Sequence, residues 1–106
     1  GQLAVDVAEE ENDVVIISTI AGAEAQTLEV IVHEDMLTIR GERKPPEGRY
    51  VYVHQECFWG KFSRSIILPF DVKGDLAYAQ YQHGVLIVRI PKAEMQRRVP
   101  ITVVDE

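Results

Sequence analysis

The aliphatic residues of this chain fall in short runs, and turn residues separate each run from the next. The 106 residues include 14 Val and 10 Ile, whose side chains suit a pleated, half-buried surface. The runs recur at intervals of about 8–15 residues, which is typical of an all-β domain. The clearest runs are residues 3–7, 14–20, 28–32, 36–39, 62–68, 77–81 and 85–90.

No segment has the length of a helix of more than a turn or two. Residues 23–27 could form one helical turn, and the pair His83-Gly84 between the last two runs is a hairpin signal. About eight short strands without helices predict an antiparallel sandwich or barrel. A chain of this length forms one domain and can bury a core without a metal or a disulfide.

One stretch does not fit a series of hairpins. The twenty residues from Gly41 to Gly60 are too many for a tight hairpin between neighbouring strands. A short strand is predicted inside this stretch, but no sequential neighbour is available to pair with it. Its backbone groups must find partners at another edge. This strand consists of Tyr50, Val51, Tyr52 and Val53.

Composition and charge exclude several classes of protein. The chain has 11 Lys and Arg against 17 Asp and Glu, a net charge of −6, whereas nucleic-acid binding needs clustered basic residues. No apolar run approaches the roughly 18–20 residues that span a bilayer. The single cysteine, Cys57, excludes an internal disulfide and fits a reducing compartment, so we expect a cytoplasmic protein.

The residues that carry chemistry in enzymes are not arranged for catalysis here. His33, His54 and His83 have no metal-ligand spacing and are expected at the surface. Ser63 and Ser65 lie in no nucleophile motif and alternate with apolar residues, which predicts outward strand positions. The sequence therefore predicts neither an enzyme, nor a cofactor, nor a metal site.

The C-terminal segment is unusual for a free tail. Val99 and Ile101 lie two residues apart, so they point to the same side of an extended chain, and Pro100 keeps that chain extended. This pattern predicts a peptide that docks on a sheet edge. The alternative is an ordinary last strand with Ile101 and Val103 inward. Two docking pairs remain open, Val99/Ile101 and Ile101/Val103, and we favour the first because Pro100 lies between its members.

Four motifs in order make the chain recognisable. They are Leu37-Thr38-Ile39-Arg40-Gly41-Glu42-Arg43, then Gly60-Lys61-Phe62-Ser63-Arg64 followed by Leu68-Pro69, then Ala79-Gln80-Tyr81-Gln82-His83-Gly84-Val85-Leu86, and finally Pro91-Lys92-Ala93-Glu94. Together they resemble the α-crystallin domain of the small heat-shock proteins, of the bacterial and plant type with a strand-exchange loop. His83 departs from the family pattern, which usually has Asn before this glycine.

The resemblance implies an immunoglobulin-like antiparallel β-sandwich of about seven to nine strands. It divides the chain into an α-crystallin domain at residues 1–92 and a C-terminal extension at residues 93–106 with a V-x-I tail motif, Val99 and Ile101. The implied function is that of an ATP-independent holdase chaperone, which binds partly unfolded client proteins and prevents their aggregation. The alternative is a co-chaperone-type β-sandwich adaptor that binds a folded partner. A carbohydrate- or cell-surface-binding module is a weaker rival.

The resemblance also implies two interaction sites. Two strands flank a groove for the tail, and alternation places on one face of each the residues Leu28, Val30, Val32, Ala77, Ala79 and Tyr81. A homodimer forms by strand exchange between the lone strand of one subunit and the first strand of the other. Its interface is expected to contain Tyr50, Val51, Tyr52, Val53, Leu3, Val5 and an ion pair of Glu56 with Arg64.

Relatives with this domain carry a variable N-terminal arm. The sequence begins at Gly1 without Met, so we expect a fragment of a longer protein. Higher oligomers are expected only where that arm is present.

Overall fold

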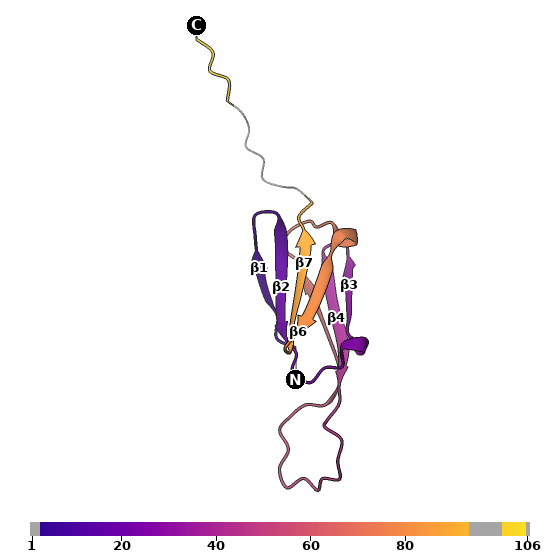
Figure 1. Ribbon diagram of the computed structural model, residues 1–106. Helices are drawn as coiled ribbons and strands as arrows, with labels where there is room; N and C mark the ends of the chain where they lie inside the picture. The colour runs from indigo at the N-terminus through magenta and orange to yellow at the C-terminus, as the bar shows by residue number, and fades with distance from the viewer. Residues whose placement is uncertain (1–2, 94–100, 106) are drawn as a thin grey trace.

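Two antiparallel sheets packed face to face form the domain, in a computed structural model that describes residues 3–93 and 101–105 (Figure 1). One sheet has the strand order β1-β2-β7-β6 and the other β3-β4-β5. The predicted β-sandwich of about seven to nine strands is confirmed, and the alternative of a barrel is wrong. The strands are β1 (Asp6–Glu9), β2 (Asp13–Thr19), β3 (Glu29–His33), β4 (Met36–Arg43), β5 (Gly60–Ile67), β6 (Tyr78–Gln82) and β7 (Val85–Pro91).

The core lies between the sheets and consists of the inward members of alternating strands. In the central strand β7, Val88 and Ile90 are fully buried, while their neighbour Arg89 lies on the outer face. Burial of such aliphatic side chains is the main force that holds two sheets together. The buried cluster comprises Leu3, Val14, Ile16, Ile20, Leu37, Ile39, Phe62, Leu68, Leu86, Val88 and Ile90.

The connections agree with the turn signals in the sequence. His83 and Gly84 have φ values of 53° and 76°, so both adopt the left-handed conformation of the two-residue turn that joins β6 to β7. Two 3₁₀ turns, η1 (Ala25–Thr27) and η2 (Gly74–Leu76), precede β3 and β6. In the described part of the chain, no helix is long and apolar enough to cross a membrane.

The first predicted strand is shorter than its alternating pattern suggested. Pairing with β2 begins at Asp6, and Val7 is 44% exposed, whereas residues 3–5 precede the strand. The carbonyl of Leu3 accepts a hydrogen bond from Arg64, and that of Ala4 accepts one from Ser18. Side chains, instead of a neighbouring strand, therefore hold this segment, which we call the strap (residues 3–5).

Two other predicted strands are not strands in this single chain. Residues 50–53 have no ladder partner among the described residues. Residues 101–105 are irregular and exposed, with Ile101 88% and Val103 80% accessible, so they do not form a last strand of the sandwich. Val99 lies outside the described residues.

The end of β7 is fixed at a junction of three elements. The N–H of Lys92 donates to Asn12 in the β1–β2 turn, and its Nζ donates to Glu9 at 3.0 Å. The same ammonium group lies 4.8 Å from the centre of the Phe70 ring. Lys92 is only 9% exposed, so its charge is satisfied by these partners. The point at which the tail leaves the domain is thus tied to the rest of the fold.

Candidate functional site

A groove with mainly Val and Ala side chains in its lining, which also exposes polar atoms, lies where the edges of the two sheets face each other. β3 ends one sheet and β6 ends the other. The groove has a volume of about 210 Å³ and reaches the core, because the fully buried Val88 forms part of its wall. Gly74 keeps one end narrow, since a Cβ atom there would come within 2.8 Å of Val32. The groove is lined by Val30, Val32, Gly74, Ala77, Tyr78, Ala79 and Val88.

Four of the six residues predicted for the groove line it, namely Val30, Val32, Ala77 and Ala79. Leu28 comes before β3, and its Cδ2 atom packs over Gly41 instead. The hydroxyl of Tyr81 donates to the carbonyl of Ile20 at 2.6 Å, which holds this side chain at the opposite end of β6.

Three lining residues were not predicted. Val88 follows from the alternation of its strand, and Tyr78 contributes from the beginning of β6. For Gly74, the only signal is that it lies in the turn before β6. Small alanines and branched valines leave a slot that suits inserted aliphatic side chains.

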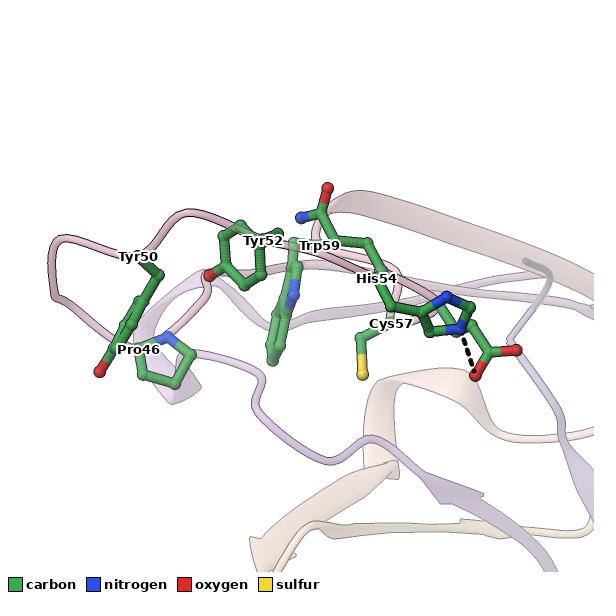
Figure 2. A pocket seen from close by; sticks show the side chains of 8 residues that line it. Pro46, Tyr50, Tyr52, His54, Cys57 and Trp59 are labelled. Atoms are coloured by element: carbon green, nitrogen blue, oxygen red, sulfur yellow. Dashed lines mark ion pairs between the residues drawn. The ribbon is translucent and has the colours of Figure 1, made fainter.

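A second apolar surface lies on the loop of residues 44–59, which projects below the sandwich in Figure 1. Val51 and Val53 are almost fully exposed, at 94% and 99%. The rings of Tyr50 and Tyr52 lie 6.0 Å apart. In Figure 2, these two tyrosines and Trp59 follow one another along the loop. They line a hollow with a volume of about 280 Å³. This much exposed apolar surface on one loop is typical of an interaction site.

The loop also contains residues that the sequence did not assign to this surface. Trp59 anchors the loop to the domain, because its ring lies close against Gly22. Cys57 is a free, exposed thiol beside the aromatic residues. The aromatic character of Trp59 was the signal that could have identified it.

The expected ion pair between Glu56 and Arg64 does not form within the described part of this chain. Glu56 lies 3.3 Å from Nε2 of His54, as the dashed line in Figure 2 marks. Arg64 donates to the carbonyl of Leu3 at 2.7 Å. The two side chains therefore have other partners here, and a contact between them across two subunits stays a prediction.

The expected first-strand partner presents an open edge. β1 pairs with β2 on one side and, among the described residues, with no strand on the other. Of the two residues predicted for this interface, Leu3 is 5% exposed and Val5 is half-buried, and both belong to the strap. The accessible edge is instead β1 itself, all four of whose residues are exposed.

The histidines and serines that the sequence analysis considered lie at exposed positions. The described residues contain no group of three or more His, Cys, Asp or Glu side chains that could hold a metal ion. His33, His54 and His83 are exposed, as expected. Ser63 and Ser65 are exposed strand residues, and the hydroxyl of Ser65 shares a hydrogen bond with Thr38. What the molecule offers is apolar surface at unpaired strand edges.

Comparison with known proteins gives consistent matches. A sequence model of the Hsp20/alpha crystallin family matches residues 6–103. Small heat shock protein C2 of Rickettsia felis is 29% identical over 100 residues, which cover 92% of this chain and 65% of that protein. The chloroplastic 26.7 kDa heat shock protein of Oryza sativa subsp. japonica is 31% identical over 99 residues, 89% of this chain and 41% of that protein. The chain thus spans less than two thirds of the length of these relatives.

Two solved structures are similar over nearly the whole chain. The hspA structure from Xanthomonas axonopodis has a TM-score of 0.79 at 32% identity and covers 91% of this chain and 98% of that one. Heat shock protein 16.0 from Schizosaccharomyces pombe has a TM-score of 0.77 at 25% identity, with 99% of each chain covered.

Proposed function

Because the chain belongs to the Hsp20/alpha crystallin family of small heat-shock proteins, we propose that it is an ATP-independent holdase chaperone. It binds partly unfolded client proteins through apolar surface and keeps them from aggregating. The observation that carries the proposal is the open groove between β3 and β6, where aliphatic side chains lie at two sheet edges that have no further strand among the described residues. In this mechanism no reaction is catalysed, no cofactor is needed and the protein works in the cytoplasm.

The groove takes the tail of another subunit. Ile101 and Val103 are 88% and 80% exposed, so neither is seated in the groove of its own chain. The slot beside Ala77 and Ala79 has room for aliphatic side chains, and the pair from the tail is Val99 and Ile101. When the tail leaves, the groove becomes available to a client, because burial of apolar surface favours whichever segment is present.

Two subunits associate through the 44–59 loop. Residues 50–53 carry exposed aliphatic and aromatic side chains, and their backbone has no ladder partner in the described chain. The edge of β1 on a second subunit supplies that partner, and a two-fold axis makes the exchange reciprocal. Arg64 and Glu56 meet across this interface, where a bidentate contact would strengthen it.

The dimer is tested by shortening the loop. Replacement of residues 44–55 by a short Gly-rich turn removes the exchanged strand and keeps the Trp59 anchor. We expect a folded monomer at micromolar concentration by analytical ultracentrifugation, with an unchanged circular dichroism spectrum. As a matched control, Glu47→Gln in the exposed part of the loop should leave the dimer intact. A shortened chain that still sediments as a dimer would move the interface elsewhere, most plausibly to the strand that contains Phe62 and Ile66.

The holdase activity is tested with reduced insulin, whose B chain aggregates without heating. We expect the chain to lower light scattering in proportion to its concentration, equally with and without ATP. If it suppresses no aggregation of this or any other unfolding client but binds a folded protein, the adaptor reading is correct and the holdase proposal is wrong.

A further inference from the structure

The strap of residues 3–5 closes the side of the sandwich opposite the groove. Its Leu3 side chain is 5% exposed and belongs to the core cluster, and Val5 packs against that cluster, whereas Ala4 between them is exposed. This segment, with two aliphatic residues around a small one, lies between β2, which contains Ser18, and β5, which contains Arg64. We call the place that it occupies the seam between β2 and β5.

Two polar side chains at inward positions hold the strap. Ser18 lies on β2 two residues after the buried Ile16 and is 1% exposed, and its Oγ donates to the carbonyl of Ala4 at 2.7 Å. Arg64 lies at an inward position of β5 and donates to the preceding carbonyl, that of Leu3, at 2.7 Å. Each sheet therefore aims one donor at the same short stretch of backbone.

These donors bond to the backbone of the segment and do not distinguish between its side chains. Consecutive carbonyl groups are present in every extended polypeptide, so the polar part of the seam is tolerant of sequence. The apolar part demands only aliphatic residues two positions apart, as Leu3 and Val5 are. A folded partner would be recognised through its side chains. A seam that recognises backbone carbonyl groups suits the varied segments of unfolded proteins.

The strap can leave without breaking a strand. Among the described residues, no backbone hydrogen bond outside the strands involves residues 3–5, and the ladder with β2 begins at Asp6. Its departure would uncover aliphatic surface and release both donors, and a buried donor such as the Ser18 hydroxyl strongly favours a new acceptor.

We propose that the strap is a releasable plug and that the seam between β2 and β5 is a binding site for extended client segments of the pattern aliphatic-x-aliphatic. The plug and the client segment compete for Ser18, Arg64 and the apolar seam. The proposal rests on the chaperone function proposed above, to which it adds a second client site distinct from the groove.

The test weakens the plug and measures binding of a peptide. Leu3→Ser removes the main buried side chain of the strap, and Gln80→Ala is the control at an exposed position of β6, outside the strap and the seam. The probe is the pentapeptide Gly-Leu-Ala-Val-Asp-amide with fluorescein on its N-terminus, followed by anisotropy. Because the peptide no longer competes with a buried leucine, we expect Leu3→Ser to bind it at least about tenfold more tightly than the parent and Gln80→Ala to bind it as the parent does.

A second probe tests whether the seam recognises the carbonyl groups of the peptide. An ester in place of the amide after the alanine of the peptide makes that carbonyl a weaker acceptor, and it should reduce the affinity for Leu3→Ser. Ser18→Ala in the Leu3→Ser chain should reduce the affinity for the amide peptide and make the ester and amide peptides bind equally.

Several outcomes overturn the proposal. One is a Leu3→Ser chain that unfolds cooperatively yet binds the peptide no better than the parent. Another is a new assembly of Leu3→Ser chains that excludes the peptide, since the seam then takes a second copy. If Leu3→Ser does not fold, methyl NMR of the parent decides. Saturating peptide must move the Leu3 methyl signals to the chemical shifts of an exposed leucine, and unshifted signals reject the plug. Peptide binding with no suppression of insulin aggregation would instead reject the chaperone function alone.

Discussion

The two open sides of the sandwich differ in whether a described segment of the chain covers them. On the side of β2 and β5, the strap fills the seam, and its Leu3 is 5% exposed. On the side of β3 and β6, the groove remains open and is lined by small and branched aliphatic residues. Both sides have inward-facing apolar residues, and within residues 3–93 and 101–105 only the side of β2 and β5 is covered by a segment of the chain. The comparison teaches that the open side is where another chain adds most, because nothing must first be displaced there.

The sharpest way to break this comparison is to fill the open side. Ala79→Trp places a large ring in the groove at an exposed position, so the fold is kept while the slot is lost. We expect a peptide of residues 97–105 to bind at least about a hundredfold more weakly, because the burial of two aliphatic side chains is removed. Isothermal titration calorimetry measures this effect, with Gln80→Ala on the same strand as control. Equal binding by the Ala79→Trp variant would show that the tail docks elsewhere.

The closed side is tested by truncating its plug. Leu3→Ala removes a buried side chain of the core cluster and should lower the free energy of unfolding by about 3 kcal/mol. Urea denaturation followed by the fluorescence of Trp59 measures it. Gln80→Ala, at an exposed outward position, should change the free energy by less than about 0.5 kcal/mol. A Leu3→Ala chain as stable as the parent would mean that the strap is not part of the core.

The corresponding change in the tail separates stability from assembly. Ile101→Ser should leave the unfolding of the single chain unchanged, since Ile101 is 88% exposed. It should weaken tail-dependent assembly by about tenfold or more, because one buried aliphatic side chain contributes roughly 1.5–3 kcal/mol. Sedimentation over a range of concentrations measures this. Val103→Ser is the matched comparison, and a larger effect there would select the Ile101/Val103 pair.

The smallest expected effect concerns a single hydroxyl. Ser18→Ala leaves the carbonyl of Ala4 without its donor and should destabilise the domain by about 1 kcal/mol. Hydrogen exchange should show the change concentrated near the strap and the adjacent start of β1. A uniform effect across both sheets would indicate that Ser18 serves the core as a whole.

Much of the fold could be predicted because alternation is a local signal. The inward residues of β7 and the His83-Gly84 turn follow from neighbours in the sequence. The position at which the first strand begins could not be predicted, since residues 3–7 alternate in the same way whether or not they pair. What ends the ladder is the capture of Leu3 and Ala4 by side chains 61 and 14 residues away.

The groove also combines residues that the sequence could predict with contacts that it could not. Alternation put Val30, Val32, Ala77 and Ala79 on common faces, and these four side chains line the groove. Tyr81 shares their parity but is drawn to the carbonyl of Ile20, a contact between distant segments that no periodicity encodes. Loop residues 50–53 carry strand-type side chains, yet they form no ladder with any described residue, so the sequence pattern alone did not decide whether they pair.

The junction at Lys92 gives the tail a fixed starting point and therefore a defined maximum reach. Its starting point is fixed by contacts to Glu9, Asn12 and Phe70, and nine positions separate Lys92 from Ile101. A fully extended stretch of that length reaches about 30 Å, so a tail docked through Ile101 sets an upper limit on the distance between the junction of one subunit and the groove of the next. The number of residues in this linker then sets the largest spacing that two subunits can have in any assembly that the tail holds together.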